Sequence, residues 1–180
     1  VAHPVRDLLR QRVFGLACGY ADCNDAARLI DDPIHKLVLD RGQGWHTDGP
    51  WDSEVCKATQ LYALEIPSYG GDTLFANATM AYDHLPADTK ASIDILNAIH
   101  SVEYSRRTGG VALATEEEIR KAPNVKHPLA RVHPVTGKKA IYAGCHAWKI
   151  DGWSEEKSRP LLDMLLSHAV QERFVYRHKW

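Results

Sequence analysis

The most informative segment of this chain is Gly42-Gln43-Gly44-Trp45-His46-Thr47-Asp48-Gly49-Pro50-Trp51. It places an imidazole and a carboxylate two residues apart, at His46 and Asp48. In a β-strand, side chains at positions i and i+2 point to the same face, with Cα atoms about 6.5 Å apart, so both can reach one ion. One histidine and one carboxylate make up two thirds of the facial triad of non-heme iron(II) oxygenases. The pair is therefore a candidate metal site that needs a third ligand from elsewhere.

Segments on both sides of this pair have the composition of strands and turns. The turn residues at 67–73 separate two β-compatible runs, and Pro134, Thr136 and Gly137 lie between two apolar arms. We expect strands at 36–39, 55–66, 74–75 and from 174 onward, and a hairpin over 131–142.

Two segments have the periodicity of amphipathic helices. Ile93, Leu96 and Ile99 recur at a spacing of three, which predicts a helix between residues 86 and 99. A second stripe, from Leu161 to Ala169, predicts a helix near the end of the chain. Pro160 suits only a first helical turn, so this helix is expected to begin near Ser158.

The region between these helices is polar and irregular. It contains Arg106-Arg107-Thr108-Gly109-Gly110 and an acidic run at 116–118, and we expect a mobile loop with one short helix. Strands interrupted by helices without a βαβ rhythm predict a mainly β fold with helices, an antiparallel sheet or barrel.

Length and charge limit the class of protein. The 180 residues, 44% of them hydrophobic, are enough for one core, so we expect a single globular domain over residues 1–180. A formal net charge of -1 gives no field that would attract nucleic acid or an anionic membrane. No apolar run approaches the roughly 20 residues that span a bilayer. The four cysteines show no Cys-x-x-Cys spacing, which favours reduced thiols in a cytoplasmic protein.

A single His-x-Asp pair is weak evidence, because the chain holds ten histidines, but further motifs follow it in a specific order. They are Gly70-Gly71-Asp72-Thr73-Leu74-Phe75, Ala81-Tyr82-Asp83-His84-Leu85-Pro86, His127-Pro128-Leu129-Ala130-Arg131-Val132-His133-Pro134-Val135-Thr136-Gly137-Lys138 and Phe174-Val175-Tyr176-Arg177-His178-Lys179-Trp180. Together with the Trp45-His46-Thr47-Asp48 segment, they resemble the taurine / 2,4-dichlorophenoxyacetate dioxygenase family over residues 42–180.

The resemblance implies an iron(II)- and 2-oxoglutarate-dependent dioxygenase on a double-stranded β-helix, the cupin-like jelly roll. It makes His46 and Asp48 iron ligands, and places Thr73 where a hydroxyl helps to bind 2-oxoglutarate. Such an enzyme uses O2 to hydroxylate a small organic substrate, and releases succinate and CO2. The residues agree with this role, because a hydroxyl can donate to a carboxylate and two glycines let the backbone approach a ligand. An ordinary turn is the alternative for residues 70–73.

Three aromatic residues are candidates for substrate contact by the same resemblance: Trp51, Tyr104 and Trp148. Packing in the core is the alternative role for each of them. Gly44 stands where taurine-hydroxylating members have a polar amide, so taurine is disfavoured. A sulfonate, an alkyl sulfate or an aryloxyalkanoate remains a candidate substrate. The arginines 106 and 107 could bind an anionic substrate from a lid, although solvated loop charges are the alternative.

The family pattern also needs a third iron ligand, a histidine, and an arginine for 2-oxoglutarate, and both are expected beyond Trp180. His178 lies before that position and is not expected to be the ligand. We therefore expect a fragment of a longer protein, with a jelly roll that is incomplete at its C-terminal side. Alone, these 180 residues are expected to be inactive and poorly stable. A homo-oligomer is compatible with the sequence.

Two other classes of function stay open at this point. One is a non-catalytic jelly-roll module that binds a metal or a ligand, as a degenerate relative of the oxygenases. The other is a zinc hydrolase, which ranks last because the sequence offers neither a general base nor a histidine-rich ligand set.

Overall fold

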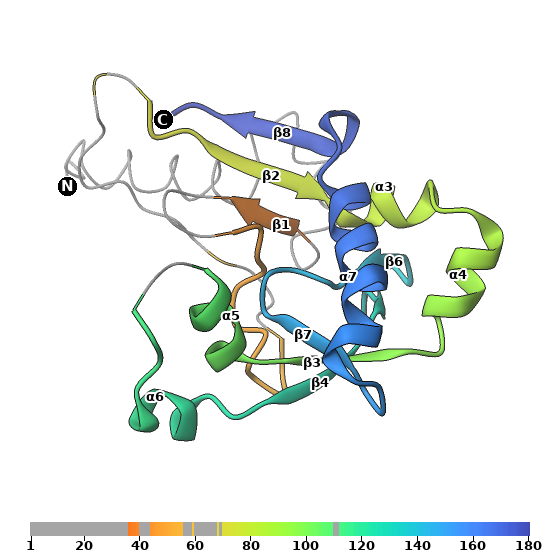
Figure 1. Cartoon of the computed structure of the whole chain (residues 1–180). Helices are drawn as coiled ribbons and strands as arrows, with labels where there is room; N and C mark the ends of the chain where they lie inside the picture. Colours follow the sequence, from red (N-terminus) through yellow and green to blue (C-terminus); the bar gives the residue numbers. More distant parts are fainter. Residues whose placement is uncertain (1–35, 40–43, 56–58, 60–67, 69, 110–111) are drawn as a thin grey trace, which may run out of the picture.

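The computed structural model of the chain describes residues 36–39, 44–55, 59, 68, 70–109 and 112–180. Helices and strands alternate irregularly along it (Figure 1). The strands are β1 (Lys36–Leu39), β2 (Thr73–Asn77), β3 (Asn97–His100), β4 (Val125–Pro128), β5 (Ala130–Val132), β6 (Lys139–Ile141), β7 (Ala147–Ile150) and β8 (Val175–His178). The helices are α3 (Ala78–Asp83), α4 (Ala87–Ile93), α5 (Val102–Thr108), α6 (Glu116–Lys121) and α7 (Glu155–Ala169), with a 3-10 turn, η1 (Glu172–Phe174).

Every strand pairing among the described residues is antiparallel. One sheet has the order β1-β2-β8, a second has the order β4-β3-β7, and β5 pairs with β6 as a hairpin. In the first sheet, Thr73 at the start of β2 is opposite His178 of β8. The antiparallel pairing that the sequence predicts is therefore confirmed, but the described chain is a mixture of helices and strands rather than mainly β.

Several predicted elements are present at the expected places. The strand predicted at 36–39 is β1, and the one predicted at 74–75 extends to five residues as β2. The hairpin predicted over 131–142 is formed by β5 and β6, and Gly137 in its turn has φ +71°, a conformation that favours glycine. Most of the strand predicted at 55–66 lies outside the described residues.

The helix predicted between residues 86 and 99 is wrong in its second half. Helix α4 ends at Ile93, and residues 97–100 form β3, the central strand of its sheet. Ala98 and His100 are buried while their neighbours are only partly covered, which is the two-residue period of a strand. Pairing on both sides with β4 and β7 satisfies the backbone, so tertiary hydrogen bonds decide the conformation here.

Two further boundaries differ from the prediction. Residues 102–108 form helix α5 rather than a loop, and the Ser101 side chain caps it by accepting from the backbone N–H of Tyr104. Helix α7 begins at Glu155, before the expected Ser158, because Ser154 caps it and accepts from the N–H of Lys157. The final strand begins at Val175, one residue later than expected.

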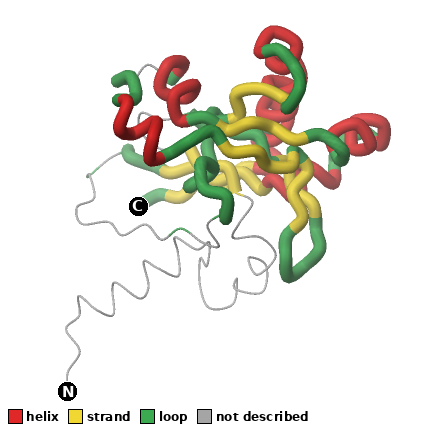
Figure 2. Tube along the Cα trace, turned by 90° about the horizontal axis from the view of Figure 1, so that it is seen from below, coloured by secondary structure: helices red, strands yellow, loops and turns green. Residues whose placement is uncertain are grey.

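Helix α7 packs along β7 and against α3, and its apolar stripe supplies much of the core. In Figure 1 it runs from the β2 and β8 sheet to the β3 and β7 sheet. Figure 2 shows helices on the outside of the strands, with the α5 and α6 pair away from the other helices. The largest fully buried apolar side chains are Tyr142, Ile93, Leu129, Ile141, Ile150, Leu162 and Leu165. Within the described part of the chain, no helix is both long and apolar enough to cross a membrane.

Candidate metal and substrate site

His46 and Asp48 lie in a loop that is fixed against the segment between β6 and β7. The backbone N–H of Cys145 donates to the carbonyl oxygen of Trp45 at 2.8 Å. A Cβ atom at Gly44 would lie 3.3 Å from the Cβ of Cys145, which is tighter than an ordinary contact, so glycine suits this close approach. After Asp48, Gly49 has φ +65° and its carbonyl accepts from Asp52, which turns the chain.

The two side chains converge although they are not in a regular strand. The Nδ1 of His46 lies 2.9 Å from the carbonyl oxygen of Gly44, so Nδ1 carries the hydrogen and Nε2 presents its lone pair. This Nε2 lies 3.4 Å from Oδ1 of Asp48. A hydrogen bond from one ring nitrogen to a backbone carbonyl is how metal-binding histidines are commonly oriented.

This arrangement fits a divalent metal ion. Divalent transition metals bind nitrogen and oxygen ligands at about 2.0–2.2 Å, so one ion can contact both atoms across 3.4 Å. In the metal-free protein, a hydrogen bond from the protonated His46 ring holds the pKa of Asp48 below its usual value, against the opposite effect of burial. The carboxylate is therefore ionised, and a metal ion can take the place of the Nε2 proton between the two side chains. His46 is only 6% exposed, whereas the Asp48 side chain is 39% exposed, so the imidazole is buried and the carboxylate is open to solvent.

Among the described residues, no three His, Cys, Asp or Glu side chains are grouped to hold an ion, so no third ligand is seen beside His46 and Asp48. His178 packs on Trp180, with ring centroids 4.7 Å apart, on the β8 strand. His146 is nearer, with its ring centroid 6.4 Å from that of His46. Burial lowers the pKa of His146 to about 4, so it is neutral at pH 7.

A cavity of about 670 Å³ opens beside the pair. Part of its lining is His46, Asp48, Trp51 and His146, and another part comes from α5 and α6. The ring of Trp51 meets that of His146 edge-on at 5.4 Å. Of the three predicted substrate aromatics, Trp51 is thus the one the structure brings to the cavity.

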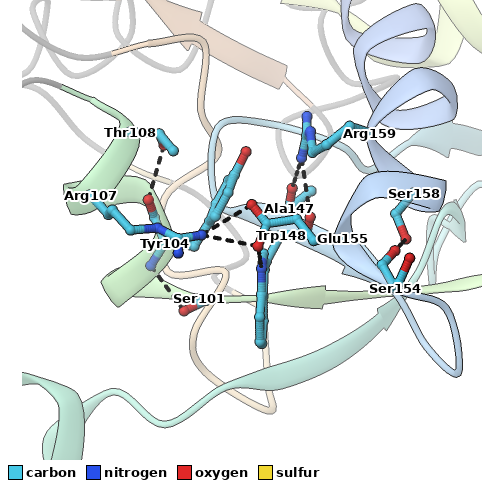
Figure 3. Close-up of polar contacts among 10 residues, drawn as sticks. All are labelled: Ser101, Tyr104, Arg107, Thr108, Ala147, Trp148, Ser154, Glu155, Ser158 and Arg159. Atoms are coloured by element: carbon cyan, nitrogen blue, oxygen red, sulfur yellow. Dashed lines mark hydrogen bonds and ion pairs between the residues drawn. The ribbon is translucent and has the colours of Figure 1, made fainter.

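Tyr104 and Trp148 lie instead in a polar cluster between α5 and α7 (Figure 3). Trp148 donates through Nε1 to Glu155 at 2.6 Å, and Arg107 reaches both oxygens of the same carboxylate at 3.0 Å. The guanidinium of Arg159 lies over the Tyr104 ring at 5.4 Å. Neither aromatic is among the residues that line the described cavity, and Trp148 connects β7 to α7 through Glu155.

Thr73 lies at the start of β2 and is 4% exposed. Its hydroxyl oxygen accepts a hydrogen bond from Nε1 of Trp180 at 2.9 Å. The hydroxyl hydrogen is still available to a ligand, because a threonine hydroxyl accepts and donates at once. The neighbouring Asp72 pairs with Arg177 at 3.1 Å, which reinforces the junction of β2 and β8. Thr73 does not line the cavity beside His46.

Sequence reasoning missed His146 and the role of His127. The Nε2 of His127, on β4, donates to the carbonyl oxygen of Pro50 at 3.0 Å and so fixes the turn after Asp48. His127 is in a segment that the sequence marks as a motif, but its partner is 77 residues away. His146 follows a strand without any motif of its own, and only the tertiary contact with the 44–48 loop brings it to the site.

Comparisons with known proteins show what the chain is similar to. A family model described as "Taurine catabolism dioxygenase TauD, TfdA family" matches residues 17–180. The chain is 38% identical over 138 residues to an alpha-ketoglutarate-dependent 2,4-dichlorophenoxyacetate dioxygenase of Burkholderia sp. (strain RASC), covering 77% of this chain and 46% of that protein. It is 31% identical over 182 residues to an alpha-ketoglutarate-dependent sulfate ester dioxygenase of Pseudomonas putida, covering 94% and 60%.

The chain is also similar to a solved structure. The crystal structure of AAD-2 in complex with Mn(II) and N-oxalylglycine superimposes with a TM-score of 0.60 at 35% identity, over 82% of this chain and 50% of that one. The chain spans about half the length of the curated relatives that it matches.

Proposed function

Because the chain belongs to the taurine catabolism dioxygenase TauD, TfdA family, we propose that its protein is an iron(II)- and 2-oxoglutarate-dependent dioxygenase. The whole protein would hydroxylate a small organic substrate and release succinate and CO2. The observation that carries this proposal is the pair formed by Nε2 of His46 and Oδ1 of Asp48, 3.4 Å apart at the wall of the cavity. The family makes this function preferable to a non-catalytic binding module.

His46 and Asp48 would hold the iron ion, which with bound 2-oxoglutarate and O2 supplies the oxidising power. The chain's own residues orient the ligands and keep water out. The Gly44 carbonyl fixes the His46 ring, and the His127 side chain fixes the turn behind Asp48. The partly covered Trp51 and the buried His146 make a wall that excludes water from the reacting bond.

Several finer assignments belong to the proposal. The third iron ligand would come from outside the described residues, and a double-stranded β-helix would complete the antiparallel sheets. Thr73 would donate its hydroxyl hydrogen to 2-oxoglutarate. Trp51, Tyr104 and Trp148 remain proposed substrate residues, and Trp51 has the strongest support because it lines the cavity. Residues 1–180 would form one catalytic domain of a cytoplasmic protein.

The substrate class follows from the names of the relatives. They include a dioxygenase for 2,4-dichlorophenoxyacetate, one for sulfate esters and a sulfonate dioxygenase of Saccharomyces cerevisiae. We propose an organic anion of this kind: an aryloxyalkanoate, an alkyl sulfate or a sulfonate.

The test is 2-oxoglutarate-dependent succinate formation by the whole protein with iron(II), across aryloxyacetates, alkyl sulfates and sulfonates. Calorimetry with Mn(II) measures the metal site independently of turnover. His46→Ala and Asp48→Ala are expected to remove both signals, because each deletes a proposed ligand. His84→Ala is the matched control, since His84 is exposed and does not line the cavity. Full activity in His46→Ala, or no turnover with any substrate, would reject the proposal.

A further inference from the structure

We propose that Arg106 is the specificity-determining residue that binds the anionic group of the substrate. This inference rests on the proposed function, and it names the side chain that would select organic anions. Arg106 lies on α5 and lines the same cavity as His46 and Asp48.

Helix α5 turns one face toward the cavity. Val102, Ser105, Arg106 and Gly109 all line it, and their spacing of three and four residues places them on one side of the helix. Arg107 follows Arg106 directly but leaves this face, and it is absent from the cavity lining. Adjacent arginines of equal charge therefore have different environments.

The guanidinium of Arg106 has few partners. Among the described residues, its Nη2 lies 3.4 Å from Oε1 of Glu118, and the two side chains are 38% and 45% exposed. A single long contact of this kind contributes little to stability. Arg107, in contrast, makes two hydrogen bonds of 3.0 Å to Glu155 (Figure 3). With respect to the described residues, Arg106 thus keeps most of its five donors available to a ligand.

The Glu118 carboxylate has other hydrogen-bond partners besides Arg106. Its Oε2 accepts from the backbone N–H of Thr115 at 2.8 Å and from the Thr115 hydroxyl at 3.0 Å, in the capping box of α6. When Arg106 turns to a substrate, Glu118 keeps these two bonds, so the exchange of partners costs little.

The other cation in the cavity lining is less suited to this role. Lys121 forms an ion pair with Glu117 at 2.6 Å, one helical turn before it. A lysine also presents a single point charge, whereas an arginine offers two parallel donors that match a carboxylate, sulfate or sulfonate. The positive charge of Arg106 acts inside the cavity as well. It adds to burial and to His46 in holding the pKa of His146 below its usual value.

The geometry gives the bound substrate a direction. Arg106 lines the same cavity as Val102, Trp51 and the pair of His46 and Asp48, so a substrate held by its anionic group at Arg106 would keep its remainder in the cavity of the metal site. Fixing one end of a substrate in this way aligns the reacting bond with the metal site.

The experiment compares Arg106→Gln with Arg107→Gln in the whole protein. The ligand is the acid of the panel that binds the wild-type protein most tightly by calorimetry, and the second probe is its uncharged amide. We expect Arg106→Gln to raise KM for the acid, and the Kd of the acid measured by calorimetry, by about 10- to 100-fold, the value of one charged hydrogen-bonded contact. The Kd of the amide should change little, whereas kcat for the acid should fall as well, because its reacting bond is held less well. Arg106→Lys should lie between wild type and Arg106→Gln.

Arg107→Gln should leave KM and Kd of the acid unchanged. Equal Kd values for the acid in wild type and Arg106→Gln would overturn the proposal, as would an equal loss in Arg107→Gln. Calorimetry separates this result from the proposed function. If the protein shows no turnover but the Kd of the acid still rises in Arg106→Gln, only the oxygenase assignment is rejected. If the protein turns over but the Kd of the acid is the same in wild type and Arg106→Gln, only the anion site at Arg106 is rejected.

Discussion

The hydrogen bond from His127 to Pro50 is expected to support both the stability of the fold and the metal site, and His127→Phe tests it. His127 is 3% exposed, and its Nε2 lies 3.0 Å from the carbonyl oxygen of Pro50, two residues after Asp48. Phenylalanine keeps a ring that can pack edge-on against His100 and Tyr142, as His127 does at 5.3 and 5.4 Å. It has no donor for the Pro50 carbonyl.

The magnitude follows from the burial of both groups. A hydrogen bond contributes about 1 kcal/mol net, and a buried carbonyl left without a donor costs about 1–3 kcal/mol. We expect the free energy of unfolding to fall by about 2 kcal/mol, which lowers Tm by about 4–8 °C in a domain of this size. Urea unfolding and a thermal melt of the whole protein measure the two quantities.

The same variant should weaken metal binding. Without the anchor on β4, the turn that begins at Gly49 is less ordered, and the adjacent Asp48 is held less well. Loss of an outer partner of a metal ligand typically costs about 10- to 100-fold in affinity, and Mn(II) calorimetry would detect it.

His168→Phe is the matched control for this loss. His168 also bonds to a backbone carbonyl, that of Ala81 at 2.8 Å, but it lies on α7 and does not line the cavity. The His168→Phe protein should lose stability but bind Mn(II) as tightly as wild type. A His127→Phe protein that binds Mn(II) as tightly as His168→Phe would show that His127 does not support the metal site.

Two further predictions concern pH. Burial lowers the pKa of His100 to about 3 in the folded protein, whereas the unfolded chain takes up this proton near pH 6.5. The stability of wild type should therefore fall below pH 6.5 relative to that of His100→Leu, by about 1.4 kcal/mol per pH unit, and parallel pH-dependent unfolding curves would contradict this. Hydrogen bonds from Lys139 and Tyr82 lower the pKa of Asp94. Asp94→Asn should therefore lower Tm by a few degrees at pH 7, and the difference should disappear as the pH falls below 4; a difference that persists at pH 2 would disprove the role of the charge.

The sequence predicts best where a local signal agrees with the tertiary environment. The hairpin of β5 and β6 follows from its turn residues, because Gly137 can adopt a positive φ that other residues avoid. The stripe from Leu161 to Ala169 is a helix because its helical periodicity places the apolar side chains on the face that packs against β7. The segment from Leu96 to Ile99 shows the opposite case. Its apolar spacing suits a helix, but residues 97–100 form backbone hydrogen bonds with the neighbouring strands β4 and β7.

By itself, the sequence determined the antiparallel class of the fold, the family and the candidate pair His46 and Asp48, since each depends on residue types at short spacings. The tertiary structure alone decided that His146 and Arg106 share a cavity with that pair, while Tyr104 and Trp148 lie in a polar cluster between helices. The physical reason is that these contacts join segments far apart in the chain. The packing of Gly44 on Cys145 and the bond from His127 to Pro50 hold the loop of the pair in place, and no local pattern encodes either contact.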